Sequence, residues 1–191
     1  MPRVTTAFAA ALALFMPLGR PLPVGLTPAV GIGTALLSTQ IAYAQTADDW
    51  LDSGNNKYDI GDYQGAIIDY TKAIENNPLS KVAYAYRGHA KYILDNNKEA
   101  LIDLDKAIEL DSDYGFAFFM RALVKSVLYD YQGALADYEK AIEIDPLDEF
   151  NYSSRGMVKE KMGDLQGACS DWRKAKELGH DNVGKWIKKQ C

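Results

Sequence analysis

Residues 47–191 predict an all-α fold, in which four helix-turn-helix units stack as a solenoid and a C-terminal helix caps the stack. The first observation behind this prediction is a 34-residue repeat that runs without insertion through the units 47–80, 81–114, 115–148 and 149–182. The second is that small and aromatic residues recur at fixed places in every unit. The third is that Gly61 falls where the first unit needs a turn, and that Pro78 and Pro146 end the first and third units.

Four sets of residues, each recurring once per unit at the same position, define the repeat. The aromatic set is Trp50, Tyr84, Phe118 and Tyr152. The small set is Gly54, Gly88, Ala122 and Gly156. Two sets contain only alanine, namely Ala66, Ala100, Ala134, Ala168 and Ala73, Ala107, Ala141, Ala175. Small residues allow two helix backbones to approach closely, and aromatic side chains then fill the space between hairpins.

The first unit illustrates the expected elements. Its first helix is predicted from Ala47 to Ile60, followed by a turn at Gly61-Asp62-Tyr63 and a second helix that ends near Asn76, before Pro78. One hairpin cannot bury its own apolar face, so several must stack. The segment 183–190 contains Trp186 among lysines and is predicted to form the capping helix, which closes the last open face.

These sets at a 34-residue period resemble the tetratricopeptide repeat family over essentially all of residues 47–191. The pairs Arg87-Gly88 and Asp69-Tyr70 are similar to a variant common in bacterial, notably cyanobacterial, members. The resemblance implies a right-handed superhelix whose concave groove is lined by the first helix of each unit. It implies a scaffold that binds peptides or proteins, and it implies no reaction.

The resemblance also implies which side chains line the groove. They are Leu51, Asn55, Tyr58, Tyr86, His89, Tyr92, Phe116, Phe119, Met120, Leu123, Phe150, Ser153 and Met157. Some relatives hold the terminal carboxylate of a chaperone tail with Lys, Asn and Arg, but here only Asn55 matches those positions. The middle of the surface is aromatic and aliphatic, so the expected ligand is an apolar segment of another protein. Burial of the phenylalanines in the core is the alternative.

A mostly basic set stands where the family usually has leucine, and an acidic set also recurs in every unit. Asp69, Asp103, Asp137 and Asp171 recur at the repeat period, as do Ser53, Arg87, Arg121 and Arg155. Ser53 has no charge to offer Asp69, so pairing within a unit fails in the first unit. Pairing each Asp with a cation of the next helix along the chain predicts ion pairs between units, which are Asp69–Arg87, Asp103–Arg121, Asp137–Arg155 and Asp171–Lys189. Solvated charges are the alternative.

The N-terminal segment 1–44 predicts a signal peptide that is cleaved after Ala44. Two apolar stretches precede Ala42-Tyr43-Ala44, the small-x-small pattern of a cleavage site, and neither is long enough for a confident membrane span. An uncleaved anchor and a start at Met16 are alternatives. Export predicts the periplasm or secretion, or the thylakoid lumen in a photosynthetic source. In an oxidising compartment Cys169 and Cys191 are candidates for a disulfide, with two unlinked thiols as the alternative.

Charge and motifs exclude other functions. Residues 1–44 contain two cations and no acid, so residues 45–191 hold all 26 acids and 19 cations, a net charge of −7. That balance argues against binding to nucleic acid. No cysteine precedes Ala44, which argues against a lipid anchor, and no catalytic, metal or cofactor motif is present. The sequence thus predicts a non-enzymatic adaptor or assembly factor. The alternative is a structural homo-oligomer that uses the same groove.

Overall fold

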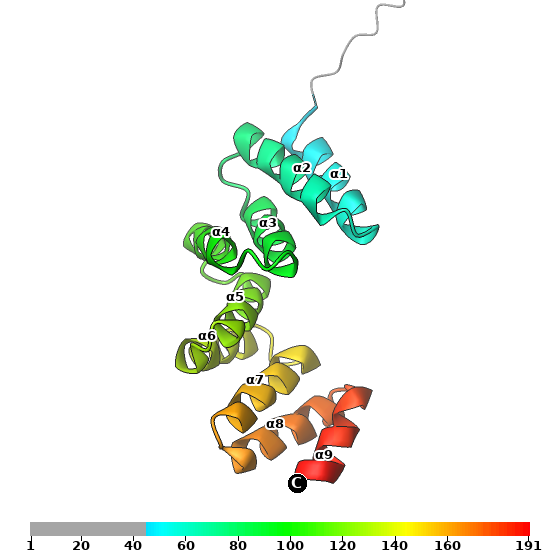
Figure 1. Cartoon of the computed structure of the whole chain (residues 1–191). Helices are drawn as coiled ribbons and strands as arrows, with labels where there is room; N and C mark the ends of the chain where they lie inside the picture. The colour runs from blue at the N-terminus through cyan, green and yellow to red at the C-terminus, as the bar shows by residue number, and fades with distance from the viewer. Residues whose placement is uncertain (1–44) are drawn as a thin grey trace, which may run out of the picture. The chain divides into compact units, whose positions relative to one another are not determined.

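The computed structural model describes residues 45–191 and shows the predicted all-α solenoid, with four hairpins followed by a terminal helix (Figure 1). The predicted signal peptide, residues 1–44, lies outside the described residues. The first helices of the hairpins are α1 (Ala47–Asp59), α3 (Lys81–Ile93), α5 (Gly115–Val127) and α7 (Glu149–Lys161). The second helices are α2 (Tyr63–Asn76), α4 (Asn97–Leu110), α6 (Tyr131–Ile144) and α8 (Leu165–Glu177). A 3-10 turn at Asp181–Val183 leads into α9 (Gly184–Gln190).

The turn inside each hairpin uses one left-handed residue and, in three hairpins, an aspartate cap. Gly61 and Gly163 adopt φ values of 82° and 84° in the first and fourth hairpins. The corresponding residues of the second and third are Asp95 and Tyr129, at 61° and 64°. At the start of α2 the Asp62 carboxylate accepts a hydrogen bond from the Gly65 amide at 2.9 Å, and α6 and α8 begin in the same way.

Close approach of the two helices explains the small set. A Cβ atom at Gly54 would lie 2.5 Å from the Tyr70 ring, and one at Gly156 would lie 2.5 Å from Nε1 of Trp172. Both alanine sets are at most 1% exposed. Small residues therefore bring the helices of a hairpin together, and the large buried rings Tyr70, Tyr138 and Trp172 fill the space around them.

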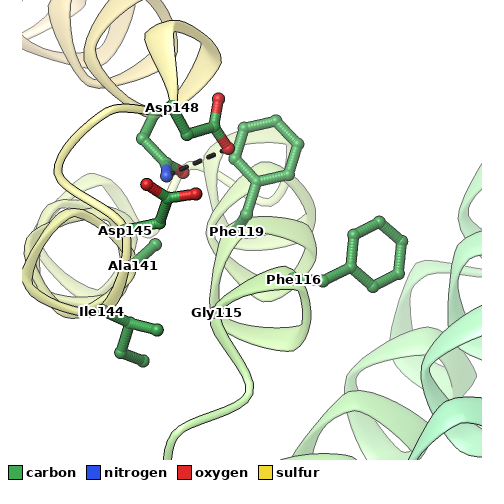
Figure 2. Close-up of a pocket in the computed structure, with 8 residues that line it drawn as sticks. Gly115, Phe116, Phe119, Ala141, Ile144, Asp145 and Asp148 are labelled. Atoms are coloured by element: carbon green, nitrogen blue, oxygen red, sulfur yellow. Dashed lines mark hydrogen bonds between the residues drawn. The ribbon is translucent and has the colours of Figure 1, made fainter.

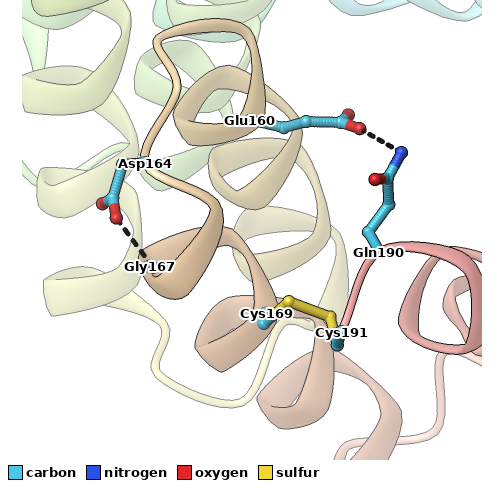
Figure 3. Close-up of a disulfide and its surroundings, with 6 residues drawn as sticks. All are labelled: Glu160, Asp164, Gly167, Cys169, Gln190 and Cys191. Carbon is cyan, nitrogen blue, oxygen red and sulfur yellow. Dashed lines mark hydrogen bonds between the residues drawn. A yellow bond between two sulfur atoms is a disulfide. The ribbon is translucent and has the colours of Figure 1, made fainter.

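Successive hairpins pack through α2 against α3, α4 against α5 and α6 against α7. At the C-terminal end Trp186 of α9 packs on Trp172, with ring centroids 5.6 Å apart. A disulfide joins Cys169 of α8 to Cys191, with Cα atoms 5.8 Å apart (Figure 3). Beside it, Gln190 donates a hydrogen bond to Glu160 at 2.9 Å. The terminal helix is thus bound to the last hairpin by packing and by a covalent bond. Within residues 45–191 no helix is both long and apolar enough to span a bilayer.

The Asp–Arg pairs form within hairpins, which corrects the predicted pairing between units. Arg87 binds Asp103 through two bonds, from Nη2 at 2.7 Å and from Nε at 2.9 Å. Arg121–Asp137 and Arg155–Asp171 repeat this geometry. In the first hairpin the Ser53 hydroxyl donates to Asp69 at 2.6 Å. The aspartates are at most 4% exposed, so these charges are not solvated.

Lysines supply the second cation to each aspartate. Lys57, Lys91, Lys125 and Lys159 lie 2.7–2.8 Å from the aspartate of their own hairpin. Lys57 therefore provides the charge that Ser53 lacks. These lysines also recur at the repeat period, so the sequence contained the signal for pairing within hairpins. Asp171 binds Arg155 and Lys159, and Lys189 is not its partner.

The arginines still contribute to contacts between hairpins. Arg121 Nη1 donates to Asp105 of the preceding hairpin at 2.6 Å, and Arg87 Nη1 donates to Thr71 at 3.1 Å. Each guanidinium also lies over the aromatic ring one helical turn earlier, as Arg87 does over Tyr84 with 5.6 Å to the ring centre. An arginine can therefore bind its own aspartate and the neighbouring hairpin at the same time.

Candidate partner-binding groove

Aromatic side chains of the first helices meet across three hairpins. The ring of Tyr58 on α1 lies 5.1 Å from His89 on α3, which in turn lies 6.0 Å from Phe116 on α5. Tyr86 of α3 lies 5.4 Å from the same phenylalanine. The helical repeat puts residues three or four apart on one face, so Tyr86 and His89 both face this surface. We call Tyr58, Tyr86, His89 and Phe116 the aromatic cluster.

A cavity of about 340 Å³ opens beside the aromatic cluster. Its remaining lining residues are Asn55, Asp59 and Tyr70. The Tyr70 hydroxyl donates to the Asn55 side-chain oxygen at 2.9 Å, and the Tyr58 hydroxyl lies 3.0 Å from the ring nitrogens of His89. Four of the polar side chains thus bond to one another in two pairs, and the Asp59 carboxylate stays exposed at the edge of the cavity. The faces of the rings remain for contact with a ligand.

Burial affects the ionisation of the cluster. It lowers the pKa of His89, because the charged imidazolium is poorly solvated there. Burial also raises the pKa of Tyr58 to about 12. Both side chains are therefore uncharged at neutral pH, and the aromatic cluster presents an apolar, uncharged surface.

The predicted groove residues differ in exposure. Ten are half-buried, which leaves part of each side chain at the surface: Leu51, Asn55, Tyr58, Tyr86, His89, Tyr92, Phe116, Phe119, Leu123 and Met157. Phe150 is 54% exposed and packs against His180, with ring centroids 5.2 Å apart.

Two predicted groove residues belong to the interior instead. Met120 is 1% exposed and lies with Ala117 and Val124 on the face of α5 that packs into the core. The spacing of these three residues is that of one helical face, and their neighbours include Ala85 and Leu104 of the preceding hairpin. Ser153 is 3% exposed, and its hydroxyl donates to the Phe150 carbonyl at 3.1 Å.

Sequence reasoning overlooked several residues beside the groove. Tyr70, named from the sequence only in the pair Asp69-Tyr70, also lines the cavity, and Tyr114 lies 6.0 Å from Phe116. Asp145, Asp148 and Asn151 line a second cavity that begins at Phe116 and Phe119. They lie where two hairpins join. The signal in the sequence was that Asp148 and Asn151 differ from Tyr114 and Ala117, the corresponding residues of the preceding repeat. In residues 45–191 no group of three or more histidine, cysteine or carboxylate side chains is placed to hold a metal ion.

Comparison with known proteins identifies the repeat. The tetratricopeptide repeat model matches residues 117–146, within the third hairpin. No curated protein sequence matched the chain significantly.

Solved structures give broader matches. A crystal structure of MamA is 28% identical, covers 72% of this chain and 81% of its own, and has a TM-score of 0.65. The first tetratricopeptide domain of Spaghetti (RPAP3), solved with the HSP90 peptide SRMEEVD, is 25% identical, with coverage of 62% and 94% and a TM-score of 0.61. TTC0263 of Thermus thermophilus shares the fold at 17% identity, with coverage of 76% and 81% and a TM-score of 0.68. The four repeated hairpins and the match in the third show that the described part of the chain has the fold of a tetratricopeptide-repeat solenoid.

Proposed function

We propose that the protein is a non-enzymatic adaptor that binds an apolar segment of another protein along its first helices. The observation that carries this proposal is the aromatic cluster, whose rings from α1, α3 and α5 adjoin one cavity of about 340 Å³. Tyrosine and phenylalanine are favoured at the centres of interfaces, and a partly exposed apolar surface of this kind is typical of a binding site.

The relative solved with an HSP90 peptide supports a peptide ligand in general. The chemistry of the ligand should differ, because the positions that hold a terminal carboxylate in such relatives are occupied here by Leu51, Tyr86, Phe116 and Met120. Two of these residues belong to the aromatic cluster and Met120 is buried. Recognition through inserted apolar side chains fits this surface better than recognition of a chain terminus.

Export is part of the same proposal. The pattern Ala42-Tyr43-Ala44 supports cleavage of a signal peptide, and the Cys169–Cys191 disulfide suits an oxidising compartment such as the periplasm. The thylakoid lumen is the corresponding compartment in a photosynthetic source.

Affinity capture from the source organism tests the binding proposal. The tagged full chain would be compared with Phe119→Glu and with Phe150→Glu, which places a charge at an exposed position of the same surface. Ile102→Glu is the matched control, because Ile102 is 67% exposed on α4, a second helix. Circular dichroism of all four chains would verify folding.

We expect one protein to be retained by the native chain and the control and lost with both groove variants. Retention of the same proteins by every variant would refute the groove assignment. Recovery of the chain alone, with a mass that depends on concentration, would favour the homo-oligomer.

A further inference from the structure

A second cavity, of about 300 Å³, lies where the third and fourth hairpins join (Figure 2). We call it the junction pocket. Its residues are Gly115, Phe116 and Phe119 of α5, Ala141 and Ile144 of α6, Asp145 and Asp148 of the connection, and Asn151 of α7. The pocket thus begins at the aromatic side chains of the groove and ends at two carboxylates.

The junction pocket presents the carboxylates of Asp145, an exposed side chain, and of Asp148, which is half-buried. Asp145 and Asp148 accept hydrogen bonds from the backbone amides of Leu147 and Phe150, at 3.0 and 2.8 Å. In the described part of the chain, neither carboxylate forms an ion pair. A cation that enters the pocket would therefore meet two uncompensated charges.

Asn151 adds an independent indication of a missing donor. The residue is 2% exposed, and its amide nitrogen donates to Asp148 at 3.2 Å. Its side-chain oxygen is buried without a hydrogen-bond partner. Buried polar atoms are nearly always hydrogen-bonded, so an orphaned acceptor in the wall of a cavity points to a ligand that donates.

The preceding junction shows which ligand fits. One repeat earlier in the chain, Gly115 corresponds to Lys81, Asp145 to Asp111 and Asp148 to Tyr114. There the Lys81 ammonium bonds to the Asp111 carboxylate and lies 5.1 Å from the centre of the Tyr114 ring. This second junction, between the second and third hairpins, thus binds a lysine of its own chain.

The third junction, between the third and fourth hairpins, keeps the aspartate as Asp145 but has Gly115 in place of the lysine. Gly115 has no side chain to send toward Asp145, and a Cβ atom there would lie 3.2 Å from Ile144 Cγ2. The cavity therefore lies beside Gly115, at the position where the preceding repeat has Lys81.

We propose that the junction pocket binds a lysine side chain from the segment that occupies the groove. This inference rests on the proposed function and specifies the chemistry of the partner, an apolar segment that contains a lysine. The aliphatic stem would pack on Phe119 and Ile144, and the ammonium would donate to Asp145, Asp148 and the free oxygen of Asn151. The net charge of −7 on residues 45–191 favours the approach of a cationic segment.

The test compares two capped peptides, acetyl-Leu-Lys-Leu-amide and the same peptide with norleucine, which keeps the stem and removes the charge. Binding to the full chain would be followed by the NMR shifts of the Gly115 and Asn151 amides. We expect the lysine peptide to bind about tenfold more tightly than the norleucine peptide.

Two variants localise the effect. Asp145→Asn/Asp148→Asn removes both charges while asparagine preserves the cap of α7. Its matched control, Asp130→Asn/Asp164→Asn, makes the same change at the caps of α6 and α8, outside the pocket. Gly115→Lys supplies an internal lysine, as Lys81 does in the second junction. We expect the pocket variant and Gly115→Lys to abolish the preference for lysine, and the control to retain it.

Equal affinity for the two peptides, a preference for lysine that survives in the pocket variant, or no binding of either peptide would overturn this inference. The groove proposal is judged separately, by capture with Phe119→Glu and Phe150→Glu. A partner retained through the groove, together with equal peptide affinities, would leave the adaptor in place and remove the lysine pocket.

Discussion

Replacement of Asp103 by asparagine tests the buried ion pairs most directly. Asp103 is 2% exposed and accepts bonds from Arg87 Nε at 2.9 Å, Arg87 Nη2 at 2.7 Å and Lys91 Nζ at 2.7 Å. Asparagine keeps the shape and one acceptor oxygen but removes the negative charge. The variant therefore leaves two cations side by side without a counter-ion.

The expected loss follows from this burial. Removal of one partner from a buried ion pair costs ~3–5 kcal/mol of the free energy of unfolding. The side chains of Arg87 and Lys91 are still 16% and 19% exposed, so water relieves part of the penalty. We expect Asp103→Asn to cost about 3 kcal/mol, at the lower end of that range, and to reduce Tm by about 6–12 °C for a domain of this size.

Asp105→Asn provides the matched control on the same helix. Asp105 also binds an arginine, Arg121 at 2.6 Å, but its side chain is 61% exposed. An exposed pair contributes less than about 1 kcal/mol. Urea unfolding of the full chain, followed by far-UV circular dichroism, would give both losses from the shift in midpoint. Hydrogen exchange in α3 and α4 would detect opening of the second hairpin alone, which repeat proteins permit.

An equal decrease in the free energy of unfolding for Asp103→Asn and Asp105→Asn would contradict this prediction. Equal losses would mean that the burial of Asp103 adds no penalty to the removal of its charge.

The remaining predictions concern the disulfide and acid stability. Cys191→Ser opens a link between residues 22 apart and should cost about 3 kcal/mol, seen as faster hydrogen exchange in α8 and α9. Unchanged exchange would show that packing of Trp186 alone holds α9 in place. Burial by itself would raise the pKa of Asp69, but hydrogen bonds from Lys57 and Ser53 outweigh it and hold that pKa below its usual value. The ionised Asp69 carboxylate stabilises the folded state fully above the unfolded pKa of about 3.9, and this stabilisation is lost as pH falls through the folded pKa. Asp69→Asn should therefore make the free energy of unfolding depend less on pH in acid. The control Asp52→Asn, at an exposed position, should keep the pH dependence of the native chain.

The repeat could be predicted from the sequence because it is a local property. The repeat period places Gly54 and Gly156 at equivalent points, and each lies against a large ring of its own hairpin. Helix ends also depend on nearby residues, such as Gly61 and the Asp62 cap. Residues within one helix or one turn were sufficient for these predictions.

The partners of the ion pairs and the exposure of the groove side chains depended on how the helices face one another. The period alone is compatible with Asp103 binding Arg121 or Arg87, and only the rotation of α3 against α4 selects Arg87. Met120 was predicted in the groove because the family places that position there, yet α5 turns it into the core beside Ala85 and Leu104. The lysine set that includes Lys57 and Lys91 was visible in the sequence and would have favoured the correct pairing.

The amino-acid sequence was sufficient for the all-α repeat and for the approximate ends of its helices, because spacing, glycine and capping residues act within one hairpin. The packing of the helices was needed to establish which groove residues keep exposed surface, and to place a cavity beside Gly115, Asp145 and Asp148. These features depend on the rotation and distance between helices from separate parts of the chain, and side-chain packing sets both.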